Sequence, residues 1–243
     1  MKDLTIEQVH QAIVEIILNA SELVEDAEVL FRAGKAARAY GLAYFACEEM
    51  GKLPEFIRAF EMLLSGRKVD WRQVRRTFRN HETKALNSFT MAKALDLFVP
   101  PEGEDLTITP SVVFGTLNAY HETRRSFAKV TRREEAFYCD LHNKEFRRPS
   151  AVITPNDAQG LITIARTQVR AARTNYVGKS LEEVQTQAAA TIQERQRVLT
   201  EFESELDALT PLQKEEIAKQ AGIASAEIPE VVSALRAFIK QLL

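Results

Sequence analysis

The spacing of apolar residues predicts helices along almost the whole chain. Apolar positions recur every three to four residues from Val9 to Phe31, from Phe56 to Leu64 and from Ala158 to Ala172, which is the period of an amphipathic helix. No stretch alternates apolar and polar residues for long enough to indicate a sheet. Residues that favour helix N-termini precede several of the helical stretches: Thr5, Asp70, Thr154 and Ser180. The predicted fold class is therefore all-α.

Capping residues, glycines and prolines set the expected bounds of the helices. They predict a helix at residues 6–31, a second one that follows Gly34 and ends at about residue 50 or 53, and further helices at 54–64, 71–80, 81–98, 111–129, 155–176, 181–209, 212–221 and 225–243. At Pro54 the chain either kinks or ends one helix and starts the next. The helices on either side of Asn80 are either continuous or separate. The segment 132–149 has no sustained period, so we expect an irregular loop there with a short extended piece at 137–141.

The bundle is expected to form around the stretch 34–56. The first half of this stretch is rich in alanine and glycine, which lets neighbouring helix backbones come close together. In its second half, Glu49 falls on the same face as Leu42 at about 100° per residue, which predicts that Glu49 points into the core. Glu48 precedes Lys52 by one turn and is expected to pair with it. Glu49 then needs a cation from elsewhere, because an isolated buried charge is strongly unfavourable.

Composition describes a globular protein whose charge is unevenly distributed. Of the 243 residues 45% are hydrophobic and 27% are charged, and the formal net charge is −2. Residues 181–243 hold 11 acids and 6 bases, whereas residues 67–84 hold seven bases and two acids. The basic segment is either a footprint for a polyanion or a solvated helix face. With no apolar run of membrane length and no targeting segment, we expect a cytoplasmic protein that makes no membrane contact. Cys47 and Cys139 are expected to be free thiols.

Candidate chemistry concentrates in two segments that we expect to meet. One carries Glu48, Glu49 and Lys52, and the other is basic, with Arg75, Arg76, Arg79, His81 and Lys84. A histidine oriented by a carboxylate and surrounded by cations is a workable general acid or base for cleaving a phosphodiester without a metal ion. The alternative is a buried ion pair that only fixes how the helices pack, with His81 a capping or surface residue.

The loop 132–149 offers a second set of candidates. Its candidate RNA-binding residues are Arg132, Arg133, Tyr138 and Asp140, with Tyr138 stacking on a base. The alternative is a loop that Tyr138 and Asp140 pin to the bundle. The sequence lacks the Glu-x-x-His pairs of di-metal helical bundles, so neither a metal nor another cofactor is predicted. Within the acidic segment 181–243, we expect residues 214–235 to form a helical hairpin. This hairpin either packs on the rest of the chain or binds a partner.

Three motifs give the chain a family resemblance. They are A-x-A-x-G-L-A-x-x-A-x-E-E-x-G-K at 37–52, H-x-x-K at 81–84 and FYCD at 137–140. In these motifs the chain resembles the AbiV type of abortive infection protein, a branch of the HEPN superfamily of small helical bundles. The likeness covers roughly residues 10–178. It therefore predicts a HEPN-like bundle at 1–179 followed by a helical C-terminal extension at 180–243.

The resemblance implies a homodimeric bundle that acts in bacterial antiphage defence, and it raises the question of catalysis. Many HEPN proteins cut RNA without metal, using an Arg and a His separated by four to six residues, a spacing met here by Arg75 or Arg76 with His81. On a straight helix Arg76 and His81 would point about 140° apart, so they converge only across a break or a dimer axis.

In this mechanism each candidate has a role. His81 would handle the proton, Arg75, Arg76 and Lys84 would neutralise the phosphate, and Glu49, with Glu48 and Lys52 beside it, would position the cations. The competing hypothesis is a non-catalytic protein that binds a phage or host protein, with the acid–base cluster as a structural contact and residues 181–243 as a docking surface.

Overall fold

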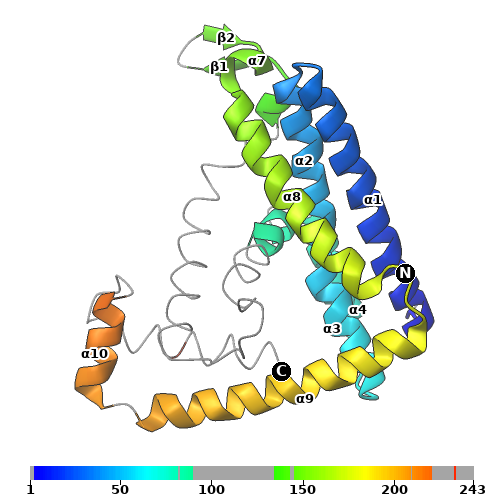
Figure 1. The fold of residues 1–243 in the computed structure, drawn as a ribbon, viewed down its shortest axis with the longest axis vertical. Helices are drawn as coiled ribbons and strands as arrows, with labels where there is room; N and C mark the ends of the chain where they lie inside the picture. Colours follow the sequence, from blue (N-terminus) through cyan, green and yellow to red (C-terminus); the bar gives the residue numbers. More distant parts are fainter. Residues whose placement is uncertain are drawn as a thin grey trace. The chain divides into compact units, whose positions relative to one another are not determined.

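The computed structural model describes residues 3–81, 83–89, 134–142, 145–208, 210–220 and 233 (Figure 1). The chain forms two compact units, one of Met1–Ala92 with Ser126–Gln185 and one of Lys93–Arg125 with Thr186–Leu243. The predicted helix 111–129 lies outside the described residues, as do the part of 81–98 beyond residue 89 and all of 225–243 except residue 233. The division predicted at 179/180 stays a prediction.

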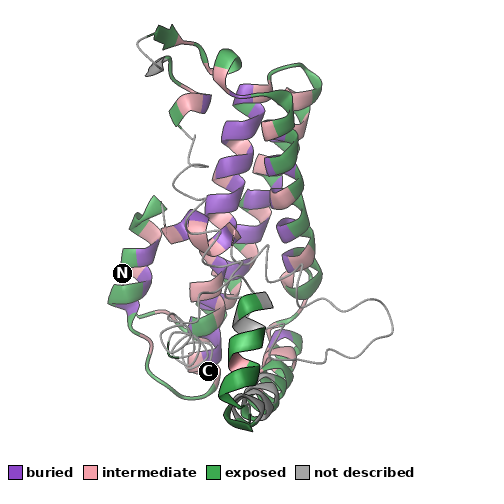
Figure 2. Ribbon diagram, turned by 90° about the vertical axis from the view of Figure 1, so that its left-hand side faces the viewer, coloured by how far each residue is buried: buried purple, intermediate pink, exposed green. Residues whose placement is uncertain are grey.

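Three long helices make the core of the first unit: α1 (Ile6–Arg32), α2 (Ala36–Met50) and α8 (Pro155–Tyr176). Each of the three packs against the other two, and α1 also contacts α3 (Leu53–Leu64). Small residues of α2, among them Ala39, Ala43 and Ala46, are fully buried, which allows this close packing. Figure 2 shows the buried residues gathered in the middle of this bundle. The all-α class is confirmed.

Local capping explains where several of the helices begin, as predicted. Thr5 and Thr154 each make a capping box, with Gln8 and with Asp157 respectively. The Asp70 carboxylate accepts the amides of Arg72 and Gln73 at the start of α4 (Trp71–Arg79). In α3, Pro54 occupies the first turn, so the chain restarts a helix there.

A break separates α4 from the next helical stretch. Asn80 has an extended backbone (ψ 104°), and its side-chain oxygen accepts the amide of Thr83 at 3.0 Å. Residues 83–89 are helical again. The two predicted helices are therefore separate, and His81 lies at the junction between them.

The segment after residue 133 differs from the expected irregular loop. It contains a 3-10 turn (Glu134–Ala136), the strands β1 (Asp140–His142) and β2 (Glu145–Arg147), and the short helix α7 (Pro149–Val152). The strands form an antiparallel hairpin in which Leu141 pairs with Phe146. The extended piece expected at 137–141 thus begins later, at residue 140, because Phe137 packs against α2 and is not part of a strand.

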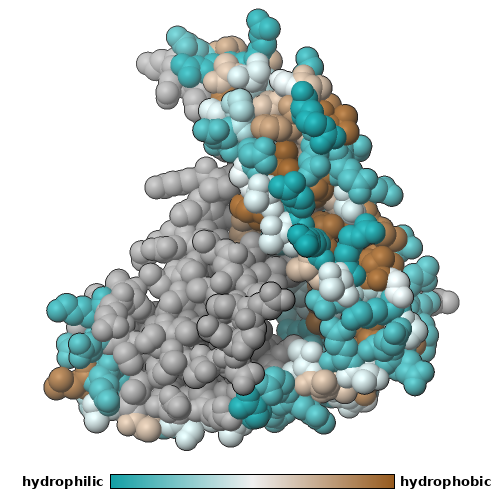
Figure 3. All heavy atoms as spheres, in the orientation of Figure 1, coloured by the Kyte–Doolittle hydropathy of each residue, from teal (hydrophilic) through white to brown (hydrophobic). Residues whose placement is uncertain are grey.

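Two helices continue beyond the core. α9 (Leu181–Ala208) begins in the first unit, where Val184 is buried, and Ser180 and Glu183 form the expected reciprocal hydrogen bonds at its start. α10 (Pro211–Gln220) belongs to the second unit. On the face shown in Figure 3, hydrophilic side chains cover most of the outward surface of the first unit's helices, and hydrophobic ones show between them. Within the described part of the chain, no helix combines the length and the hydropathy that a membrane span requires.

Candidate functional site

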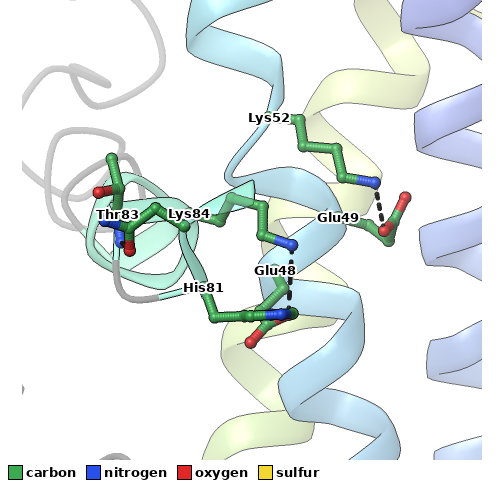
Figure 4. A network of polar contacts seen from close by, with 7 residues as sticks. Glu48, Glu49, Lys52, His81, Thr83 and Lys84 are labelled. Atoms are coloured by element: carbon green, nitrogen blue, oxygen red, sulfur yellow. Dashed lines mark hydrogen bonds and ion pairs between the residues drawn. The ribbon is translucent and has the colours of Figure 1, made fainter. Parts of the chain in front are cut away.

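The structure brings Glu48, His81 and Lys84 together at the last turn of α2 (Figure 4). The Glu48 carboxylate lies 2.8 Å from His81 Nδ1 and 3.5 Å from Lys84 Nζ, through the same oxygen, Oε2. The side chains of Glu48 and Lys84 are 5% and 7% exposed, whereas that of His81 is 56% exposed. We call these three residues the Glu48 cluster. It joins a buried acid, a buried cation and an imidazole that solvent reaches.

Burial of the Glu48–Lys84 pair sets strict demands on its surroundings. Removing two charges from water costs more than their attraction returns unless hydrogen bonds satisfy the remaining polar atoms. The bond from His81 meets part of that demand at Glu48. Loss of Glu48 would therefore leave the buried Lys84 ammonium without this carboxylate, and loss of His81 or Lys84 would remove one of the partners of the buried acid.

The bond to Glu48 also determines the state of the imidazole ring. An ionised carboxylate only accepts hydrogen bonds, so His81 Nδ1 must carry the proton and donate it. In the neutral ring Nε2 is then unprotonated and available as a base. A carboxylate that orients the histidine in this way is a recurring feature of general acid–base sites.

A second, buried network holds the helical residues 83–89 against the core. Ser88 Oγ donates to Gln168 Oε1 at 2.8 Å, and Gln168 Nε2 donates to the Ser88 carbonyl at 2.7 Å. Both residues are fully buried, and Gln168 comes from α8. At Gly51, directly after α2, a Cβ atom would overlap the backbone carbonyl of Lys84. The close approach at Gly51 and the Ser88–Gln168 pair together place His81 and Lys84 over Glu48.

Sequence reasoning missed Gln168 and gave no role to Gly51. Gln168 follows Leu161 and Ala165 at helical spacing, so a polar residue in the apolar stripe of α8 was a usable signal. Gly51 stood inside the family motif, but its partner is the backbone of a residue 33 positions later. No local pattern identifies such a partner.

The predicted roles of the two acids are exchanged. Glu48 is the buried acid that meets the basic segment, and the prediction that Glu49 points inward is wrong. Glu49 is half-buried and binds Lys52 at 2.5 Å, so the expected Glu48–Lys52 pair is also wrong. The half-exposed stripe of α2 runs through Leu42, Phe45 and Glu49. Because two of its members are apolar, this stripe looks like a core face in the sequence.

The remaining basic candidates lie on α4. Arg75 is half-buried, and Arg76 and Arg79 are exposed. The break at Asn80 removes the straight-helix geometry that would point Arg76 and His81 apart. Lys84, expected to face phosphate, is instead buried against Glu48. We therefore assign its ammonium group to the carboxylate.

The candidates of the 132–149 segment do not join the Glu48 cluster in any described contact. Arg132 and Arg133 lie outside the described residues, and Asp140 opens β1. Tyr138 is 69% exposed, so the idea that it pins the segment to the bundle is wrong. Phe137 does so instead: its ring stacks on Phe45 with centroids 5.6 Å apart, and Arg38 donates to its carbonyl at 3.1 Å. The RNA-binding role of these candidates stays a prediction.

The two cysteines are free and differ sharply in environment. Cys47 is buried and Cys139 is exposed. Burial raises the pKa of Cys47 to about 12, with a smaller upward contribution from the Glu48 charge, against a hydrogen bond with Ser88 that lowers it. The thiolate, which is the reactive form, is therefore absent from Cys47 at neutral pH.

This contrast predicts the reactivity of the folded protein toward Ellman's reagent. One thiol, Cys139, is expected to react within minutes in native buffer, and the second only after unfolding in guanidinium chloride. In Cys139→Ser no native thiol should react. Rapid native labelling of Cys139→Ser would show that the interior at Cys47, beside the Glu48 cluster, opens readily.

The described residues contain no group of three or more His, Cys, Asp or Glu side chains that could hold a metal ion. The Glu48 cluster itself offers a carboxylate, an imidazole and an ammonium group. Such groups transfer protons and stabilise negative charge.

The helical bundle, with an exposed histidine held by an acid of the Glu-Glu-x-Gly-Lys run, agrees with the HEPN class that the sequence motifs predicted, and the family model supports this class. Residues 8–170 match the model of the HEPN_AbiV family, described as AbiV, and the chain belongs to that family. No curated protein and no solved structure matches the chain. The matched range contains the whole Glu48 cluster, and the resemblance predicted from the three motifs is confirmed. The family suggests a role in abortive infection, a form of antiphage defence.

Proposed function

We propose that the protein is a metal-independent endoribonuclease that acts in abortive infection, with His81 as its proton-transferring residue. The observation that carries this proposal is the exposed imidazole whose Nδ1 lies 2.8 Å from a buried carboxylate. The Glu48 carboxylate also holds the buried Lys84 ammonium, so what favours a functional histidine is the combination of an anchored Nδ1 with a ring that is 56% exposed.

The proposed reaction uses the nucleophile that RNA itself provides. His81 Nε2 takes the proton of a 2′-hydroxyl, and the resulting oxygen attacks the neighbouring phosphorus. The bond from phosphorus to the 5′ oxygen breaks, that oxygen takes a proton from solvent water, and the proton on Nε2 returns to the hydroxide that remains. The products carry a 2′,3′-cyclic phosphate and a 5′-hydroxyl. Glu48 keeps Nδ1 protonated and fixes the ring, so that Nε2 is the basic atom throughout.

Positive charge near the reacting phosphate would come from α4. Arg75 and Arg76 precede the break at Asn80 and are the candidates for neutralising the charge that develops on the phosphate. Lys84 balances Glu48, and the Glu49–Lys52 pair lies one helical position further along α2. The family resemblance also implies a homodimer, which we propose as the active form.

The test is cleavage of total RNA by purified protein in EDTA, with the ends of the fragments identified. Wild type should produce fragments with cyclic phosphate ends. His81→Ala should lower the rate by at least about 100-fold, the usual contribution of a general base. His81→Asn is the matched variant, because its amide still donates to Glu48 but offers no base. Equal cleavage by wild type and His81→Asn would remove His81 from the mechanism.

Intact RNA in every reaction would contradict the proposed function. The Glu48 cluster would then be a structural contact, and the non-catalytic interaction with a phage or host protein would be the better account of the chain.

A further inference from the structure

α4 presents three arginines on the face opposite its buried side. Arg72, Arg76 and Arg79 follow one another at intervals of four and three residues, which places them within an arc of about 60° around the helix. The buried residues of α4 are Trp71, Val74 and Thr77. All three arginines are exposed, and no described residue forms an ion pair or hydrogen bond with their guanidinium groups. We call these residues the α4 arginine row.

Without a bound ligand, the repulsion between the arginines of the α4 arginine row lowers the stability of the helix. Like charges three or four residues apart on a helix destabilise it by about 0.2–0.5 kcal/mol per pair. The cap residue Asp70 interacts with two of these arginines: its pKa is lowered first by the amides of Gln73 and Arg72 and then by the charges of Arg72 and Arg76. One capping carboxylate does not balance three guanidinium groups. The face therefore suits a ligand with several regularly spaced negative charges.

The row leads to the exposed histidine. From Arg72 to Arg79 the helix rises about 10 Å. α4 ends at Arg79, and His81 follows two residues later, within about 7 Å of chain. An extended polyanion lying along the row would therefore end close to His81, whose ring is anchored to Glu48.

We propose that the α4 arginine row is a binding track for the backbone of single-stranded RNA, which it guides to His81. This inference rests on the proposed ribonuclease function and adds to it a substrate class, a strand path and a new binding residue, Arg72. A single strand fits better than a duplex, because modules that bind duplex RNA span about 16 base pairs, whereas α4 has nine residues. Arginine suits the task, since its planar group binds phosphate through two hydrogen bonds.

The experiment measures binding separately from cleavage. A fluorescein-labelled oligouridylate of about 12 nucleotides is titrated by anisotropy with the His81→Asn protein, which keeps the hydrogen bond to Glu48. Arg72→Gln in this background should weaken binding by about threefold to tenfold and lower the slope of log Kd against log salt by about 0.7. The triple variant Arg72→Gln/Arg76→Gln/Arg79→Gln should lower that slope by about 2.

The control removes an equal charge elsewhere in the same unit. Arg32 is exposed at the last turn of α1, and the turn joining α1 to α2 lies at the end of the bundle away from α4 (Figure 1). Arg32→Gln should leave both the affinity and the salt slope unchanged. Equal effects of Arg32→Gln and Arg72→Gln would overturn the track, as would a triple variant that binds like its parent. Thermal unfolding of each variant confirms that the exposed substitutions leave the fold intact.

The outcomes for the track and for catalysis are separable. Arginine-dependent binding without any cleavage by wild type would support the track and contradict the nuclease. Cleavage that depends on His81 but is unchanged by Arg72→Gln and Arg79→Gln would support the nuclease and contradict the track. Arginine-dependent binding of an acidic protein without any binding of the oligouridylate would also contradict the track, since the row would then serve a protein partner.

Discussion

Glu48→Gln is expected to lower the free energy of unfolding by about 3–5 kcal/mol, the usual cost of breaking a buried ion pair from one side. The substitution keeps the size of the side chain and removes its charge, so the Lys84 ammonium remains in an interior where it is only 7% exposed. Urea unfolding followed by circular dichroism measures the change. Because the typical stability of a domain is about 5–15 kcal/mol, such a loss should be easy to detect.

Glu49→Gln is the matched control for this prediction. Glu49 follows Glu48 in the chain and, like Glu48, pairs with a lysine, Lys52. The side chains of Glu49 and Lys52 are both about one-fifth exposed. Loss of the Glu49 charge should cost no more than about 1 kcal/mol. A double variant, Glu48→Gln/Lys84→Met, should recover much of the stability, because it removes the uncompensated charge. Equal costs at Glu48 and Glu49 would contradict the assignment of Glu48 as the buried acid.

The local part of the fold could be predicted from the sequence because its causes are local. Thr5, Asp70 and Thr154 cap their helices through bonds to amides two or three residues away, so the pattern and the interaction occupy the same few residues. The break at Asn80 also has a local cause, the bond from Thr83 to its side chain. An Asn followed three residues later by Thr lacks the capping-box signature, so the sequence alone does not decide whether the helix breaks at Asn80.

The choice between the two acids could not be made from helical period. α2 contacts both α1 and α8, so it is buried over most of its circumference, and small residues occur on all sides. Hydrophobic period then carries little information about the direction of a side chain. Its least buried stripe even holds Leu42 and Phe45, and Phe45 is stacked by Phe137 from nearly a hundred residues later. The sequence predicted that an acid of α2 meets the basic segment, but not which acid.

The support of the site depends on contacts between distant segments. The Ser88–Gln168 pair joins residues 80 apart, and the contact at Gly51 involves a backbone carbonyl that no sequence pattern encodes. The sequence does contain residues that fit these contacts: a small residue at 51, and side chains at 88 and 168 that can donate to and accept from each other. These become meaningful only once the helices are placed.

Gly51→Ala is expected to destabilise the protein by about 2–4 kcal/mol, since an overpacked contact with backbone cannot relax by a rotamer change. The backbone at Gly51 has φ −65° and ψ −7°, which alanine adopts without strain, so the cost is one of space alone. The new methyl group would overlap the Lys84 carbonyl and push the helical residues 83–89 away from α2. His81 and Lys84 would then separate from Glu48, and RNA cleavage should fall together with stability.

Gly160→Ala supplies the comparison for Gly51→Ala. Gly160 lies within α8, and a Cβ atom there would have no neighbour within 4 Å. Since alanine is favoured over glycine inside a helix, this variant should be unchanged or more stable by up to about 1 kcal/mol. Urea unfolding separates the two glycines, and the histidine ring signals in NMR report whether His81 has left Glu48. A Gly51→Ala protein with wild-type stability and an unshifted His81 signal would contradict this prediction. Residues 83–89 would then not need the close approach to α2. The support of the site would have to come from Ser88 and Gln168 alone.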